Sequence, residues 1–207
     1  MQQIPDVRDI VLVGGGHSHV QVLRRFGMRP QPGVRLTLVA REPHTPYSGM
    51  LPGFIAGQYS WDEVHIDLAR LSTFSDARFI ADEIVGLDPE AGRIHFDDRP
   101  PIRYDVLSIN TGGVPRRGMP VHDAVLSVKP IGRFIEGWES LLKRTRDVVG
   151  FPLAVVGGGP GSVELAIAVA EHYGSRFDIT LVTADDALLE GHSNGTCLLY
   201  TSPSPRD

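Results

Sequence analysis

Apolar and polar positions in the first forty residues alternate between strand-like runs and a helical stripe. Residues 8–13 and 34–40 read as short buried strands, the second rich in β-branched side chains. Between them, apolar residues recur at helical spacing and predict a helix that ends near Gly27; they are Val20, Val22, Leu23 and Phe26. Together these elements predict a βαβ unit of about 30 residues.

The same pattern returns near the end of the chain. A strand opens at Phe151, and residues 177–183 read as a second strand. The helix expected between them carries Val163, Leu165, Ala166, Ala168, Val169 and Ala170. The sequence therefore predicts a second βαβ unit. An apolar stripe over residues 131–146 predicts a helix that connects the two units.

The stretch between the units is less regular. Residues 41–59 are rich in Pro, Gly and Tyr, lack periodicity, and read as a long loop. Residues 62–71 read as a helix. Four short strands are predicted after it, at residues 77–81, 83–87, 93–96 and 104–110, with a hairpin turn at 88–92.

Each βαβ unit has a glycine-rich turn between its first strand and its helix. The first turn reads Gly14-Gly15-Gly16-His17-Ser18-His19, and the second reads Gly157-Gly158-Gly159-Pro160-Gly161-Ser162. Such a turn lets a diphosphate approach the backbone, and the helix N-terminus favours its charge. Two such turns in one chain indicate two nucleotide cofactors; the alternative is that each merely joins a strand to a helix.

The two turns depart from the dinucleotide fingerprint at its third glycine. His19 adds a bulky ring at that close-packed position, whereas Ser162 is small and costs little. An acid about 20 residues on should accept the ribose hydroxyls. Glu42 comes close to that position after the first turn, although it reads equally well as a solvated loop acid. After the second turn the position is the neutral Thr183, which leaves NADH or NADPH open.

Composition narrows the function classes. The 207 residues carry a net charge of −5 without a basic patch, which argues against nucleic acid. No apolar run approaches the roughly 20 residues of a membrane span, and the N-terminus lacks a signal peptide, so the cytoplasm is the expected location. Cys197 is the only cysteine, which excludes a redox-active cysteine pair within the chain. The histidines show no zinc spacing, so no metal is expected.

The last eleven residues, 197–207, resemble the translation of a transposase adapter used in preparing DNA sequencing libraries. The alternative is a natural, disordered, Ser/Pro-rich terminus. In both cases the segment is left out of the fold, and on the first reading the natural protein continues beyond about Thr196.

With both turns and the central Thr111-Gly112, the chain resembles the pyridine nucleotide-disulfide oxidoreductase superfamily. It is similar to type II NADH dehydrogenases and sulfide:quinone reductases. Residues 14–20 and 44–53 resemble more closely the flavoprotein module at the N-terminus of certain bacterial selenide, water dikinases. The resemblance runs from about Val7 to Ser193.

The resemblance implies an α/β fold of the glutathione-reductase type, with two Rossmann-like dinucleotide-binding domains, the second incomplete. Residues 7–120 would form the FAD-binding domain with an inserted β-meander, 121–149 a connector helix, and 150–196 the first part of an NAD(P)-binding domain. The residues it implies for FAD are Gly14, Gly15, Gly16, Ser18, His19, Arg41, Glu42, Thr111 and Gly112, with Asn110 in place of the usual Ala. Those it implies for the nicotinamide nucleotide are Gly157, Gly159, Pro160, Gly161, Ser162 and Glu164.

The implied activity is hydride transfer from NAD(P)H to FAD and on to a quinone-like acceptor or a selenium compound. No catalytic residue is implied, because the cofactors carry the chemistry. Peripheral membrane contact would need a C-terminal region beyond this sequence. Two alternatives stay open: the flavoprotein half of a bifunctional selenide, water dikinase, and a nucleotide-binding fragment without turnover.

Overall fold

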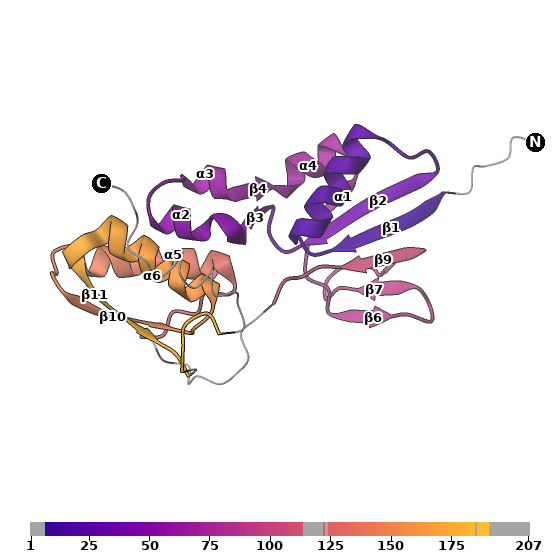
Figure 1. Ribbon diagram of the computed structural model, residues 1–207. Coiled ribbons are helices and arrows are strands. Elements are labelled where there is room, and N and C mark those ends of the chain that lie inside the picture. The colour runs from indigo at the N-terminus through magenta and orange to yellow at the C-terminus, as the bar shows by residue number, and fades with distance from the viewer. Residues whose placement is uncertain (1–6, 114–121, 123, 185, 191–207) are drawn as a thin grey trace, which may run out of the picture. The chain divides into compact units, whose positions relative to one another are not determined.

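The computed structural model describes residues 7–113, 122, 124–184 and 186–190. They form an α/β protein with two compact units, whose elements are labelled in Figure 1. Unit 1 comprises the described residues of 1–47 and 65–134, and unit 2 those of 48–64 and 135–207. The predicted tail, residues 197–207, and Asp185 lie outside the described residues.

Unit 1 is built on a four-stranded parallel sheet in the order β5-β2-β1-β9. The strands are β1 (Arg8–Val13), β2 (Val34–Ala40), β5 (Arg78–Ala81) and β9 (Val106–Ile109). Val13 at the end of β1 pairs with Val39 on one side and with Ile109 on the other. All four carboxyl ends therefore meet at one edge of the sheet, where the first glycine-rich turn begins.

Alternate residues of the central strands point to opposite faces, because side chains along a strand alternate with a period of two. Leu12 and Leu38 are buried under α1 (His17–Met28) and α4 (Leu68–Phe74) together with Leu23 and Leu68. This is the face that carries both helices in Figure 1. The sequence is apolar on consecutive strand positions because both faces are covered.

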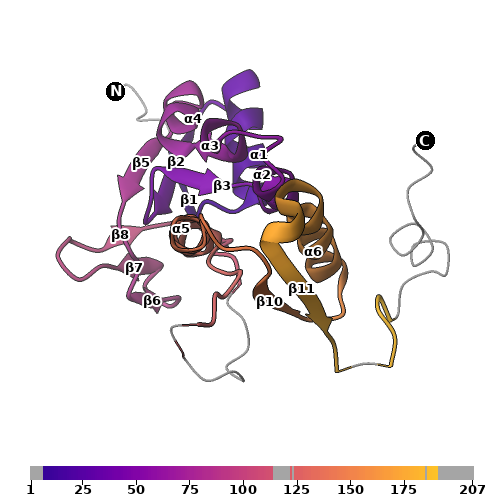
Figure 2. The same cartoon turned by 90° about the vertical axis from the view of Figure 1, so that its left-hand side faces the viewer.

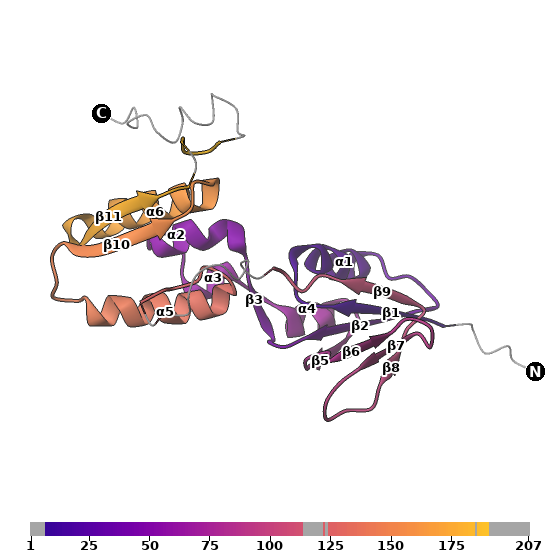
Figure 3. The ribbon, with the colours of Figure 1, turned by 90° about the horizontal axis from the view of Figure 1, so that it is seen from below.

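The opposite face of the sheet packs on a small antiparallel sheet. Val11, Val13 and Val39 are buried there with Ile94 and Phe96. The small sheet consists of β6 (Gly86–Asp88), β7 (Arg93–His95) and β8 (Ile102–Arg103). Its strands β6 and β7 lie below β1, β2 and β9 in Figure 1, and all three are labelled in Figure 3. The predicted hairpin is confirmed, although its first strand begins later than expected, and β8 was not predicted.

Unit 2 repeats the βαβ pattern on a smaller scale. β10 (Phe151–Val156) and β11 (Phe177–Val182) pair in parallel, and α6 (Pro160–Tyr173) connects them. α6 runs alongside both strands in Figure 2. The predicted connector helix is present as α5 (Ile131–Arg144), and its Trp138 is buried against Tyr173 and Phe177, each with its ring centroid 5.7 Å away.

The prediction of a long loop over residues 41–59 was wrong. The segment contains β3 (His44–Pro46), a 3₁₀ turn (Ser48–Met50) and α2 (Leu51–Ile55). α2 packs against α6 within unit 2, where a Cβ atom added at Gly57 would lie 2.6 Å from the His172 ring. Elements this short show no periodicity, so tertiary contacts define them.

The helix predicted over residues 62–71 is interrupted. α3 (Trp61–Val64) is followed by β4 (His65–Asp67), and α4 begins only at Leu68. β4 pairs with β3, His44 opposite Asp67, and the Asp67 carboxylate accepts the Arg70 N–H at 2.9 Å to cap α4. Within the described part of the chain, no helix is both long and apolar enough to cross a membrane.

Candidate functional site

The first glycine-rich turn is held by hydrogen bonds to the strands on both sides of β1. The Gly14 N–H donates to the Val39 carbonyl at 2.7 Å, and the Gly16 N–H donates to the Asn110 carbonyl at 3.1 Å. Gly14 has a φ of +93°, and an added Cβ would lie 2.3 Å from the Asn110 oxygen and 2.7 Å from the Thr111 Cα. Only glycine fits there, because the backbone that follows β9 lies directly against it.

At the remaining glycines of this turn, an added Cβ would force a neighbouring side chain to move. An added Cβ at Gly15 would meet the Leu68 side chain at 2.5 Å, and one at Gly16 would meet the Asn110 amide at 2.2–2.4 Å. Gly16 is the N-cap of α1, with φ −65° and ψ 161°. The first residues of α1, His17 and Ser18, are exposed, and the first turn of a helix leaves its N–H groups without intrahelical acceptors. The turn therefore presents free N–H groups to an anion.

His19 lies beneath this turn. Its side chain is buried, at 1% exposure. The Nδ1 atom is 2.7 Å from the Gly14 carbonyl oxygen, and the Nε2 atom is 2.8 Å from the Ser108 hydroxyl. The ring that replaces the third glycine was expected as a steric cost. It is instead accommodated between α1 and β9, with a polar partner at each nitrogen.

The other residues implied for FAD surround the same edge of the sheet. Arg41 and Glu42 follow β2 directly and are exposed, and Arg41 forms an ion pair with Glu83. Thr111 and Gly112 follow β9 and are also exposed, and Gly112 has a φ of +80°. The structure thus brings the first turn and Thr111 into contact. It places Arg41 and Glu42 just after β2 and Gly112 just after β9, at the same edge of the sheet.

The second glycine-rich turn is built in the same way. The Gly157 N–H donates to the Val182 carbonyl at 2.7 Å, the bond that corresponds to Gly14 and Val39 in the first turn. Gly157 has a φ of +136°, and an added Cβ would lie 2.6 Å from the Ser162 hydroxyl. Ser162 therefore stands close to the first glycine of its turn.

The start of α6 is open. Gly159 is the N-cap and Pro160 is the first helical residue. Among the described residues, apart from the adjoining chain and the helix backbone, no atom lies within 4 Å of a Cβ added at Gly159 or Gly161. Pro160 lacks an N–H that the first helical turn would leave unpaired in any case. Glu164 lies in α6 and is half-buried. This arrangement leaves room for a phosphate beside the second turn.

Three residues that support the glycine-rich turns were not predicted from the sequence. Asn110 lines both outer glycines of the first turn, Ser108 binds His19, and the buried Leu189 donates its N–H to the Gly158 carbonyl at 2.8 Å. Asn110 had a signal, since it replaces the Ala usual before Thr-Gly. Tyr47 stacks on His17, with ring centroids 4.6 Å apart and planes 14° apart, and nothing in the sequence pairs these two.

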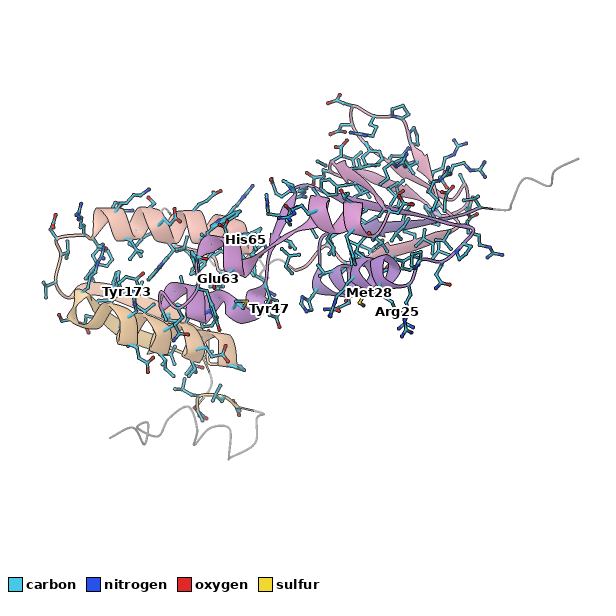
Figure 4. All side chains as sticks on the ribbon, turned by 90° about the horizontal axis from the view of Figure 1, so that it is seen from above. Arg25, Met28, Tyr47, Glu63, His65 and Tyr173 are labelled. Atoms are coloured by element: carbon cyan, nitrogen blue, oxygen red, sulfur yellow. The ribbon has the colours of Figure 1, made fainter. Side chains whose placement is uncertain are left out.

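A shallow hollow on the outer face of α1 is separate from both turns. It is lined by Gln21, Arg24, Arg25, Met28 and Arg29, which occupy one stripe in the later turns of α1. Figure 4 shows Arg25 and Met28 projecting from this helix. The hollow lies at the opposite end of α1 from the first glycine-rich turn. The described residues contain no cluster of three or more His, Cys, Asp or Glu side chains that could hold a metal.

Comparison with known proteins assigns the family. Residues 8–197 match the model of the pyridine nucleotide-disulphide oxidoreductases, which covers most of the chain. The chain belongs to this family. Its cofactors are accordingly FAD and a nicotinamide nucleotide, NAD(P)H.

Curated relatives agree with this assignment. The NADH dehydrogenase-like protein YutJ of Bacillus subtilis is 27% identical over 186 residues, 86% of this chain and 49% of that protein. The ferredoxin–NAD(+) reductase component of the p-cumate 2,3-dioxygenase system of Pseudomonas putida is 26% identical, over 89% of this chain and 44% of that protein. The chain therefore spans about half the length of these relatives.

Solved structures confirm the fold. The structure of NDH2 from Plasmodium falciparum matches 91% of this chain and 44% of its own, with a TM-score of 0.76 at 17% identity. Reduced Bacillus anthracis CoADR-RHD matches 93% of this chain and 36% of its own, with a TM-score of 0.75 at 18% identity. The predicted α/β, Rossmann-like fold is confirmed by these matches.

Proposed function

We propose that this chain is the nucleotide-binding part of an FAD-dependent NAD(P)H oxidoreductase that passes electrons to a quinone-like acceptor. The observation that carries the proposal is the pair of glycine-rich turns. Each is tied by a glycine N–H to the neighbouring strand, to Val39 in unit 1 and to Val182 in unit 2. Two turns of this build in a chain of this family support two dinucleotides.

In this proposal the first turn binds FAD and the second binds NAD(P)H. Thr111-Gly112 follows only the first unit, and its backbone lies against Gly14, which supports the assignment. The free N–H groups at the start of α1 would hold the FAD diphosphate, while Arg41 and Glu42 would lie near its adenosine. Gly159, Gly161 and Ser162 would take the nicotinamide nucleotide, with Pro160 opening α6 and Glu164 further along it.

The chemistry needs little acid–base help from the protein. A bound flavin would supply the hydride-accepting chemistry, and the first turn would hold its diphosphate. The chain's own part is to bind and orient the two cofactors, since proximity and alignment supply most of the acceleration of such a transfer. With Cys197 as the only cysteine, no cysteine pair in this sequence can relay electrons.

The choice of acceptor is supported by the relatives. The sulfide-quinone reductase of Aquifex aeolicus is 24% identical over 106 residues, 51% of this chain and 24% of that protein, and its name specifies a quinone. The ferredoxin–NAD(+) reductase component of Pseudomonas putida makes a ferredoxin-like protein the second candidate acceptor. No observation on the described residues favours a selenium compound or a fused kinase, so neither enters the proposal.

The assignment of the two turns is tested by placing a carboxylate in each. Gly16→Glu should abolish FAD binding and spare NADH binding, because the new side chain displaces Asn110 and repels the diphosphate. Gly159→Glu should spare FAD binding and weaken NADH binding. Titration of the purified chain with FAD and with NADH, followed by fluorescence, measures both.

Gly132→Glu is the matched control, because Gly132 is exposed, lies in α5 outside both turns, and has no neighbour among the described residues within 4 Å of an added Cβ. It should bind both ligands as the unmodified chain does. Loss of FAD from the Gly159 variant with full retention in the Gly16 variant would reverse the assignment. Retention of both ligands by both variants would refute the proposal.

A further inference from the structure

His19 fixes the orientation of one peptide group in the first turn. A carbonyl oxygen only accepts hydrogen bonds, so the 2.7 Å contact to Gly14 requires a proton on Nδ1 of His19. In the neutral ring with this tautomer, Nε2 is an acceptor, and the Ser108 hydroxyl donates to it at 2.8 Å. The ring is 1% exposed, so water does not compete for either bond.

The direction of the Gly14 carbonyl determines the direction of the next N–H. In a planar trans peptide the C=O and the following N–H point to opposite sides. The Gly14 oxygen points at the buried His19 ring, so the Gly15 N–H points away from it. The Gly15 N–H has no hydrogen-bond partner among the described residues, whereas those of Gly14 and Gly16 are both used. Gly15 thus holds the one free N–H of the three glycines.

We propose that His19 is a positioning residue for the FAD diphosphate: by holding the Gly14 carbonyl, it aims the Gly15 N–H at the ligand. The inference rests on the proposed function, since it takes FAD as the ligand of the first turn. In this role His19 does not contact the cofactor itself, because both of its ring nitrogens already form hydrogen bonds within the protein. The hydrogen bond to Ser108 holds the ring in place, and the hydrogen bond to the Gly14 carbonyl sets the direction of the Gly15 N–H.

Two amide variants separate these two bonds. An Asn amide nitrogen can occupy the place of the histidine Nδ1, and a Gln amide nitrogen that of Nε2. His19→Asn should therefore keep the bond to Gly14 and hold its dissociation constant for FAD within about threefold of the unmodified chain. His19→Gln and His19→Phe lose that bond and should weaken FAD binding about tenfold, the change expected from one misdirected hydrogen bond. Ser108→Ala should behave as His19→Asn does.

Leu23→Ala is the control for general destabilisation. Leu23 lies one turn further along α1, is fully buried, and belongs to the core cluster of Leu12 and Leu38. The variant should lower the thermal midpoint while leaving the FAD dissociation constant within threefold. A merely structural role for His19 predicts instead that FAD affinity follows the thermal midpoint across all five variants, and that result would overturn the inference.

Nitrogen-15 NMR of the imidazole rings tests the geometry on the unmodified chain without FAD. The His19 ring should show its proton on Nδ1, and a proton on Nε2 alone would overturn the inference even if every variant failed to fold. If the unmodified chain binds FAD, Gly16→Glu abolishes binding, and all His19 variants bind normally, only this inference fails. If the unmodified chain does not bind FAD, the proposed function fails, and the inference fails with it.

Discussion

At the residue scale, an ion pair joins the first two strands outside the candidate site. The Arg35 guanidinium lies 2.5 Å and 2.7 Å from the two carboxylate oxygens of Asp9, and the Asp9 N–H donates to Asp105 at 2.7 Å. The hydrogen bond from Arg35 lowers the pKa of the Asp9 carboxyl below its usual value. The bidentate geometry makes this a stronger pair than most surface ion pairs.

The lowered pKa sets the pH range in which the pair stabilises the fold. A carboxyl that is more acidic in the folded chain adds stability above its unfolded pKa of about 3.9, and this contribution is lost as the pH falls through the folded pKa. Arg35→Met should therefore lower the thermal midpoint near pH 7, and the difference from the unmodified chain should vanish toward pH 2. Calorimetry across that range measures it. As a control, Arg35→Met made in a chain that already carries Asp9→Asn should change the thermal midpoint by the same amount at every pH. If Arg35→Met alone lowers the thermal midpoint equally at pH 7 and pH 2, the prediction is wrong.

The sequence predicted the glycines of the site but not the roles of the residues around them. Gly14 and Gly157 were predicted from spacing alone, and both have positive φ at close approaches. His19 was expected as a cost, because a sequence does not show which way a ring points or that Ser108, 89 residues away, binds it. Long-range polar partners of this kind leave no local pattern.

At the element scale, the end of α5 depends on one side chain from outside the helix. Arg176 donates from Nε to the Thr145 carbonyl at 3.0 Å, and its Nη2 donates to both the Leu142 carbonyl and the Thr145 hydroxyl. Its guanidinium also lies over the Tyr173 and Phe177 rings, 5.7 and 5.6 Å from their centroids. The last carbonyls of a helix have no intrahelical partner, so Arg176 satisfies groups that would otherwise be half-buried and unpaired.

Arg176→Met should therefore destabilise unit 2 by about 2 kcal/mol, the range for hydrogen bonds to a charged group. Urea unfolding followed by tryptophan fluorescence measures it, because Trp138 is buried in α5 beside Tyr173. Arg133→Met on the exposed face of the same helix is the control and should change the unfolding free energy by less than about 0.5 kcal/mol. Equal effects of the two variants would show that the hydrogen bonds from Arg176 to the end of α5 do not stabilise unit 2.

Elements with several turns or buried strands were predictable, and the short ones were not. Residues 8–13 and 34–40 were predicted as strands and are β1 and β2 with the same bounds, because runs of consecutive apolar positions, four in β1 and three in β2, mark strands buried on both faces. Residues 62–71 were misread as one helix. Only residues 65–67 form the strand β4, between α3 and α4, and a strand this short is defined by its pairing with β3 rather than by a local pattern.

At the scale of the whole molecule, the two units differ in how far their sheets are built. Unit 1 has four parallel strands with helices on one face and the β6-β7-β8 sheet on the other. Unit 2 has a two-stranded sheet in the described residues, with Val156 57% and Val182 44% exposed. The sequence predicted both βαβ units and the family. It did not predict that residues 48–64 fold with unit 2, because their contacts with α6 are more than 100 positions distant.

This difference predicts the catalytic behaviour of the 207-residue chain. A two-stranded sheet with exposed valines is marginally stable alone, so the nicotinamide nucleotide should bind weakly to unit 2. FAD binding would rest mainly on the first turn. We therefore expect NAD(P)H oxidation by this chain, with ferricyanide or a soluble quinone as acceptor, to stay near the rate of free FAD. A longer protein, in which unit 2 is extended toward the length of the relatives, should purify as a yellow protein and turn over at equal flavin concentration far above that rate. Comparable turnover by both forms would show that the elements described here suffice for hydride transfer.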